Sequence, residues 1–350
     1  MDKTADISQE SLFPNNSVIS LYIKSQLILS ILLSAFLAMS CGYIEDDEEI
    51  MKAAKTMIST SPGYSIRTLD TFTFNYDGLM TMDSYQRFED TGDLSRVRIA
   101  SQGGWKKIFA CANSQIDKNG WANVNSYEAL AKMHADLGKE TMSDPVMTGE
   151  CSLNATVSED SAMDMKLIGA EVILNSVCCD FSGKGYEGEE ITDVRIYLIN
   201  VNATCSLVPG RTVMPERILN MGRLNENDMG TMSEPDLITY PFSHCITKLT
   251  EDLRIRFRCY PNTSPDESPG SPFTRLVIEG KIRGKTYFWP VNIGRENGGC
   301  GVERNCRYVY NIRITGKGSD SPDILSEEGS METETEVSQW KEKDDCIISF

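Results

Sequence analysis

The sequence predicts a mainly β protein made of antiparallel β-sandwich domains. From residue 67 onward, short runs alternate apolar and polar residues, and turns rich in Gly, Pro and Asn separate the runs. Alternation with a period of two is typical of strands with one buried face, and many short strands with close turns are typical of sandwiches. Because the chain has 350 residues, we expect two such domains.

The first 40 residues are predicted to be a signal peptide. Lys24 precedes the apolar run Leu27–Met39, whose 13 residues are too few for a membrane span of about 20 but suit a signal-peptide core. The small residues Ala38 and Ser40 stand before Cys41. This ending resembles the lipobox of bacterial lipoproteins, in which the cysteine receives a lipid and becomes the new N-terminus. The alternatives are an uncleaved signal anchor and a cysteine placed there by chance.

Residues 41–66 are expected to form a lipidated acidic tether and leader. The five acidic residues Glu45–Glu49 cannot pack in a core and predict a solvated segment. The cluster resembles the one that follows the lipid cysteine in surface-exported lipoproteins of the Bacteroides group. This resemblance implies an outer-membrane lipoprotein that faces outward and carries acyl chains such as palmitate on Cys41. A plain spacer is the alternative.

Residues 67–160 are predicted to form the N-terminal sandwich. Strands are expected over 71–76, 96–99 and 105–111, with a turn at Asp77-Gly78. One helix is expected between Asn125, as part of a capping box with Glu128, and Gly138. His134 lies on this helix, and we interpret it as a surface or packing residue.

Residues 161–325 are predicted to form the C-terminal sandwich, after a polar break near residue 160. Strands are expected over 193–199, 253–259, 276–282, 286–289 and 310–314. In the second of these, Arg254, Arg256 and Arg258 alternate with apolar residues, which predicts a basic outer face.

Residues 326–350 are expected to be a tail and a candidate donor strand. The stretch from Glu327 to Asp345 is too acidic to fold alone. Its apolar residues need a groove or a sheet edge for burial. They are Val337, Trp340, Ile347, Ile348 and Phe350.

Composition argues against several classes of function. A net charge of −17 disfavours nucleic acid as a partner. The two histidines and the absence of a Cys-x-x-Cys pair leave little material for a metal site, so no metal or cofactor is expected. We find no nucleophile, zinc-protease or phosphate-loop motif and expect no enzyme. Cys300 and Cys306 could form a disulfide; free buried thiols are the alternative.

Several segments in order resemble the Bacteroidales fimbrillins, the subunits of type V pili. Leu69–Gly78 is similar to their opening strand, Lys166–Val172 to the strand that opens their C-terminal domain, and Lys285–Val291 to a late aromatic–proline strand. The most specific match is the turn Glu303–Tyr308, which carries an Arg-Asn-x-x-Tyr pattern and precedes the strand Asn311–Gly316.

The resemblance implies two transthyretin-like sandwiches in a structural subunit of a surface fimbrium that supports adhesion. In that family a protease removes an N-terminal strand after an arginine, and a neighbouring subunit's C-terminal segment fills the vacated groove. Residues 41–66 hold no arginine, so the candidate cleavage residues are Lys52, Lys55 and Arg67. If the leader stays attached, the chain is a lipid-anchored anchor or accessory subunit.

The expected partners are other fimbrial subunits in a head-to-tail polymer, the membrane lipid held through Cys41, and surface ligands of host or bacteria. A monomeric glycan-binding adhesin with the same fold is the alternative function. Trp105, Trp121 and Trp289 could stack on sugars, although we expect most of them in the core.

Overall fold

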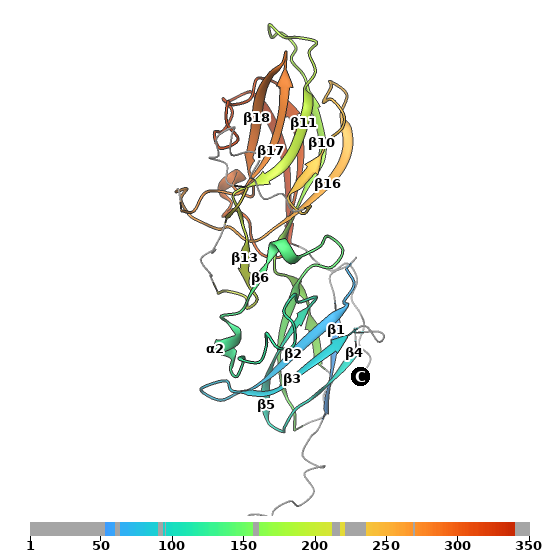
Figure 1. Ribbon diagram of the computed structural model, residues 1–350, viewed down its shortest axis with the longest axis vertical. Helices are drawn as coiled ribbons and strands as arrows, with labels where there is room; N and C mark the ends of the chain where they lie inside the picture. Colours follow the sequence, from blue (N-terminus) through green and yellow to red (C-terminus); the bar gives the residue numbers. More distant parts are fainter. Residues whose placement is uncertain are drawn as a thin grey trace, which may run out of the picture. The chain divides into compact units, whose positions relative to one another are not determined.

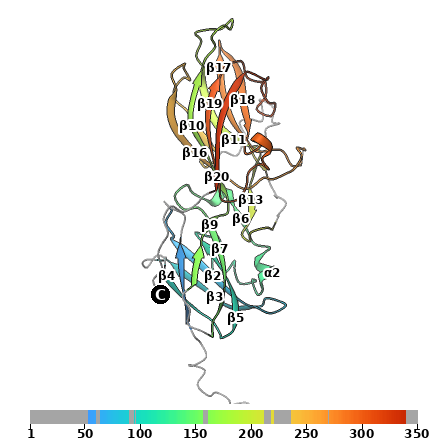
Figure 2. The ribbon, with the colours of Figure 1, turned by 180° about the vertical axis from the view of Figure 1, so that it is seen from behind.

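The computed structural model describes residues 53–59, 64–89, 94, 96–156, 161–211, 218–220, 236–268 and 270–339 (Figures 1 and 2). Strands dominate this part of the chain, and the predicted mainly β class is confirmed. The signal peptide and most of the predicted tether lie outside the described residues. The same is true of six single-residue predictions: Cys41, Lys52, Trp340, Ile347, Ile348 and Phe350.

The first sandwich consists of a five-stranded sheet in the order β3-β2-β5-β7-β9 and a three-stranded sheet in the order β4-β1-β8. Its core contains Leu69, Ile99, Ile108 and Met163, which are buried between the two sheets. All neighbours are antiparallel except β1 and β8. The strands are β1 Ala53–Ser59, β2 Thr68–Asn75, β3 Met82–Glu89, β4 Arg96–Ala100, β5 Trp105–Ala112, β7 Met147–Asn154, β8 Ser161–Asp164 and β9 Lys166–Leu167.

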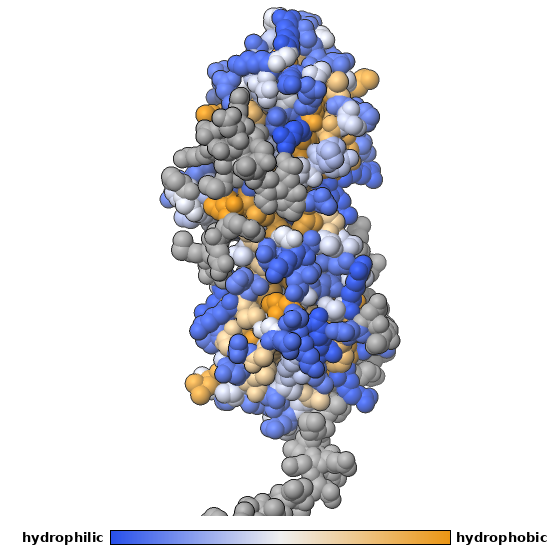
Figure 3. All heavy atoms as spheres, viewed as in Figure 1, coloured by the Kyte–Doolittle hydropathy of each residue, from blue (hydrophilic) through white to orange (hydrophobic). Residues whose placement is uncertain are grey.

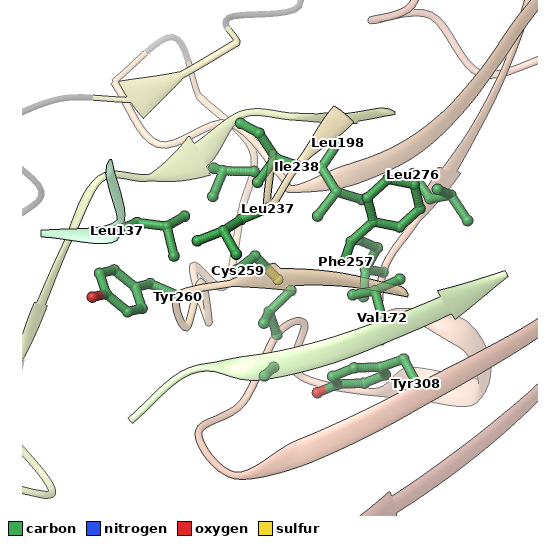
Figure 4. Close-up of a cluster of buried hydrophobic side chains, with 14 of the residues drawn as sticks. Leu137, Val172, Leu198, Leu237, Ile238, Phe257, Cys259, Tyr260, Leu276 and Tyr308 are labelled. Carbon is green, nitrogen blue, oxygen red and sulfur yellow. The ribbon is translucent and has the colours of Figure 1, made fainter. Parts of the chain in front are cut away.

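The second sandwich pairs a sheet in the order β16-β10-β19-β20 with one in the order β15-β11-β17-β18. Only β10 and β19 are parallel. Figure 4 shows part of its core, with Val172, Phe257 and Leu276 among the labelled side chains. The strands are β10 Ala170–Cys179, β11 Thr192–Ile199, β15 Thr239–Pro241, β16 Glu251–Cys259, β17 Arg275–Ile282, β18 Lys285–Asn292, β19 Cys306–Ile314 and β20 Met331–Gln339.

The prediction of a helix from Asn125 to Gly138 is wrong in its cap and its length. The helix α2 spans only Tyr127–Leu130, and Ser126 caps it by accepting a hydrogen bond from the backbone of Ala129. The segment that follows is the strand β6, His134–Asp136, which pairs with β13, Thr204–Ser206. The spacing of apolar residues reports only on local structure. Here the backbone of 134–136 forms hydrogen bonds with a strand that is distant in the sequence, and no helix forms. The short helix η2, Leu137–Lys139, follows.

The predicted basic outer face of β16 is correct for Arg254 and Arg256 and wrong for Arg258. Arg254 and Arg256 are exposed, whereas Arg258 is 2% exposed. The reason is that the end of β16 packs against the segment around Thr141 of the first sandwich, whose backbone carbonyl accepts a hydrogen bond from Arg258 at 2.7 Å. Alternation predicts which side a residue faces, but not that another part of the chain covers that side.

The strands β8 and β9 pair with β1 and β7 of the first sandwich. The second sandwich begins with β10 at Ala170. We therefore place the change between sandwiches at residues 168 and 169. Other short elements are the strands β12 Val201–Asn202 and β14 Ile218–Leu219, and the helix η4 Glu296–Gly298.

The described surface in the view of Figure 3 is largely hydrophilic, with smaller hydrophobic areas. Among the described residues, no helix has the length and the apolar run that crossing a membrane requires.

Candidate functional site: strand β1 and the junction of the sandwiches

The strand β1 is the middle strand of its sheet. Thr56 pairs with Val97 of β4 on one side and with Ser161 of β8 on the other. The strands β4 and β8 are not neighbours of each other, so only β1 connects them. Without β1, both would present unpaired backbone donors and acceptors, which makes a slot for one added strand.

Buried apolar side chains surround the slot. Val97 and Ile99 of β4 and Met163 of β8 are buried, and they belong to one cluster with Leu69 and Ile108 of the opposite sheet. A strand that replaced β1 would therefore bury apolar side chains as well as pair its backbone.

Two of the three candidate cleavage residues lie in the described part of the chain. Lys55 is in the middle of β1, where its backbone pairs with Arg98. Arg67 lies between β1 and β2, its side chain is 63% exposed, and its Nε is 2.9 Å from the Asp144 carboxylate. Its backbone N–H donates to Asn113 Oδ1 at 2.9 Å. Arg67 thus has an exposed side chain and lies outside the strands, downstream of the whole of β1, whereas the backbone of Lys55 is paired within β1.

The first part of the predicted tail forms the edge strand β20. Nine consecutive residues, Met331–Gln339, pair antiparallel with β19, and Val337 lies opposite Tyr308. The Val337 side chain is 54% exposed. The strand β20 is therefore the edge of its sheet, and the Val337 side chain is not covered by the second sandwich.

The Arg-Asn-x-x-Tyr turn joins the two sandwiches. Arg304 donates to the backbone carbonyls of Ser206 and Leu207, each at 2.9 Å, and to Thr148 Oγ1 of the first sandwich. Asn305 has a φ of 59° and accepts from the backbone N–H of Leu167 at 3.1 Å. The motif that carries the family resemblance thus positions the short connection between the sandwiches.

A second group of contacts at the junction surrounds Glu171. Its carboxylate accepts from Arg256 Nε at 2.6 Å and from Arg307 Nε at 2.8 Å. Tyr64, which follows β1 in the sequence, places its hydroxyl 3.0 Å from Arg256 Nη2 and 3.1 Å from Arg258 Nη2. Contacts so far apart in the sequence leave no periodic signal, and sequence analysis did not identify this group.

Glu140 lies buried in the same junction. Tyr260 donates its hydroxyl to Glu140 Oε1 at 2.6 Å, and Arg258 Nη1 is 3.9 Å from Oε2. Burial raises the pKa of Glu140 to about 7, against the opposing effects of Tyr260 and Arg258. Figure 4 shows Tyr260 beside Leu137 of the first sandwich, and both belong to one continuous hydrophobic cluster.

The other residues that the sequence singled out, the tryptophans, two cysteines and a histidine, do not lie together in one site. Trp121 and Trp289 are buried in the core, whereas Trp105 is 62% exposed. Cys300 is exposed, Cys306 is buried, and both carry free thiols. His134 lies in β6, half-buried. Within the described ranges, no cluster of His, Cys, Asp and Glu is arranged to hold a metal ion.

Comparison with known proteins finds similar folds but no similar sequences. No family profile matches the chain, and no curated protein matches it. A candidate cell adhesion protein from Bacteroides eggerthii superimposes with a TM-score of 0.65 at 14% identity, covering 83% of this chain and 96% of that one. The fimbrilin of Porphyromonas gingivalis gives 0.57 at 14%, covering 82% and 97%. The tip fimbrial protein Mfa3 of the same organism, with a C-terminal truncation, gives 0.52 at 13%, covering 83% and 99%.

These likenesses extend over nearly the whole length of the solved chains. They confirm the fold that the motifs predicted, a fimbrillin-like arrangement of two β-sandwiches. At such low identity the likeness shows the fold alone.

Proposed function

We propose that this protein is a structural subunit of a surface fimbrium that polymerises head to tail by strand exchange. The observation that carries the proposal is the position of β1, the middle strand of its sheet and upstream of an exposed arginine. Its removal would open a slot for a strand from another subunit. The fimbrial and adhesion proteins with the same fold support this function and a cell-surface location.

Among the three cleavage candidates we propose Arg67. Proteases bind an extended, unpaired segment, and Lys55 would first have to leave the sheet. A cut after Lys55 would also leave Thr56–Ser59 in the slot, whereas a cut after Arg67 removes all of β1. Since β2 begins at Thr68, a cut after Arg67 leaves all strands other than β1 intact.

We propose the end of the tail as the donor. The edge strand β20 ends at Gln339, and Trp340, Ile347, Ile348 and Phe350 follow it in the sequence. The apolar stretch at 346–350 is long enough to pair with β4 or β8, which contribute five and four residue pairs to β1. Contacts between a tail on one subunit and a slot on another do not close a ring and therefore build filaments.

The test is deletion of residues 340–350, which leaves β20 and both sandwiches complete. We expect the truncated chain to fold with unchanged thermal stability and, after removal of the leader, to form no filaments in electron micrographs. A truncated chain that still forms filaments would exclude the tail as donor.

We propose that Cys41 is lipidated during export to the outer membrane, so that the lipid holds the subunit until the leader is removed. Cys41→Ala is expected to abolish the incorporation of labelled palmitate, and label retained by this variant would contradict lipidation. If the leader is retained, the same chain would serve as a permanent anchor subunit.

A second candidate function is glycan binding by a monomer, favoured by one observation. Trp105 and Tyr76 are both largely exposed, and the Tyr76 backbone N–H donates to the Trp105 carbonyl at 3.1 Å, so the two aromatic residues are neighbours. Sugar binding by a stable monomer that is lost in Trp105→Ala would favour this function over the polymer.

A further inference from the structure

Three arginines lie close together at the junction, two of them around the Glu171 carboxylate and the third beside Glu140. Arg256 and Arg307 both pair with Glu171, whose side chain is 1% exposed, and Arg258 approaches from the same strand as Arg256. We call Arg256, Arg258 and Arg307 the arginine cluster. Its three guanidinium groups face two carboxylates, Glu171 and Glu140, so it keeps an excess of positive charge on a chain whose net charge is −17.

Tyr64 covers the cluster. Its hydroxyl lies within hydrogen-bond distance of Arg256 and Arg258, and its ring centroid is 5.2 Å from the guanidinium carbon of Arg258. Tyr64 precedes Arg67 in the sequence, so the proposed cut removes it together with β1. The cluster then loses its cover at the step that opens the slot.

The loss of Tyr64 takes one acceptor each from Arg256 and Arg258, while Arg256 and Arg307 keep Glu171. Arg258 keeps the backbone carbonyls of Thr141 and Met142 at 2.7 and 3.2 Å and the Glu140 carboxylate at 3.9 Å. Its Nε is buried without a hydrogen-bond partner even while Tyr64 is in place. Unpaired charged donors at low exposure favour an incoming carboxylate.

Resting on the proposed function, we infer that the arginine cluster is a docking site for carboxylates in the tail of a second copy of this chain, which replace Tyr64 after processing. Charge complementarity identifies the occupant. The stretch Glu327–Asp345 holds eight acidic and two basic residues, and Glu342, Asp344 and Asp345 directly precede the apolar end of the tail.

The position of the cluster fits this occupant. Ser59, at the end of β1, pairs with Asp164 of β8, six residues before the second sandwich begins at Ala170. The slot therefore ends at the junction. When the apolar end of a tail that enters from this end lies between β4 and β8, the carboxylates that precede it stay at the entrance of the slot, beside the arginines.

The experiment compares two synthetic peptides of residues 340–350, one native and one with Glu342→Gln, Asp344→Asn and Asp345→Asn. Binding to the chain is measured by fluorescence polarisation before and after the cut at Arg67. We expect the cut chain to bind the native peptide at least tenfold more tightly than the neutralised peptide at low salt. This difference in affinity should shrink at high salt, because screening weakens the ion pairs. The uncut chain should bind neither peptide.

Two chain variants locate the effect. Arg307→Gln should reduce the difference between the peptides, whereas the control Arg254→Gln, on β16 with its side chain 75% exposed and paired to Asp252, should preserve it. Equal affinity of both peptides for the cut chain would overturn the docking site and leave strand exchange standing. Binding of neither peptide would instead overturn the tail as donor.

Discussion

Arg304 shows how one side chain can hold two sandwiches together. Its guanidinium donates to two carbonyls of the 206–207 segment and to Thr148. The sequence identified the turn that contains Arg304 through its resemblance to fimbrillins. It could not assign the partners, because they lie about 100 and 150 residues away and follow no spacing rule.

We predict that Arg304→Met, which keeps the apolar stem and removes the donors, lowers the free energy of unfolding by about 2–3 kcal/mol. The reason is that hydrogen bonds from a charged donor are worth about 1.5–3 kcal/mol and that the acceptors lose their partner. Urea unfolding measures the change. A cost no larger than that of the exposed control Arg254→Gln would contradict the role of Arg304.

Glu140 predicts a pH dependence of stability. Its pKa in the folded chain is about 7, above its ordinary value of 4.5, because burial disfavours the charged carboxylate. The folded chain therefore holds this proton more strongly than the unfolded chain does. The contribution of Glu140 to stability is most favourable below pH 4.5 and declines as the pH rises to about 7, by roughly 3 kcal/mol.

Glu140→Gln should remove this decline, since the amide cannot ionise and can still accept from Tyr260. The free energy of unfolding of the variant minus that of the native chain should be larger at pH 8 than at pH 5, by about 2–4 kcal/mol. The exposed Glu336→Gln is the matched control. The same stability difference at both pH values would show that Glu140 does not titrate in this range.

At the scale of elements, the strands were predictable and their pairing was not. The run Leu253–Cys259 has one apolar face, and the structure contains β16 there. The segment His134–Asp136 reads as helical from its local spacing, yet it pairs with β13, some 70 residues away. Similarly, no alternation of apolar and polar residues predicts that β1 pairs with β4 and β8. Local patterns fix the type of an element only when no distant partner competes for its backbone.

Under the proposed function, the segment around Arg67 decides whether the leader is removed. We predict that Arg67→Gln blocks removal of the leader, while Lys55→Gln leaves removal unchanged, because Lys55 is paired within β1. The length of the surface-exposed chain, measured by immunoblotting, checks both variants. A shortened Arg67→Gln chain would move the cut to another residue.

At the scale of the whole molecule, the fold follows from the alternation of short strands and turns, and the solved structures confirm it. The junction holds polar groups from both sandwiches, including Tyr64 of the leader, so processing is expected to change the junction as well as the sheet. One proteolytic event would then open the slot and uncover the arginine cluster.

The most direct test is mass spectrometry of the N-terminus of this protein in filaments purified from the cell surface. We predict that the chain begins at Thr68 and carries no lipid. Filaments built from chains that begin at acylated Cys41 and retain β1 would exclude strand exchange through the slot of β1.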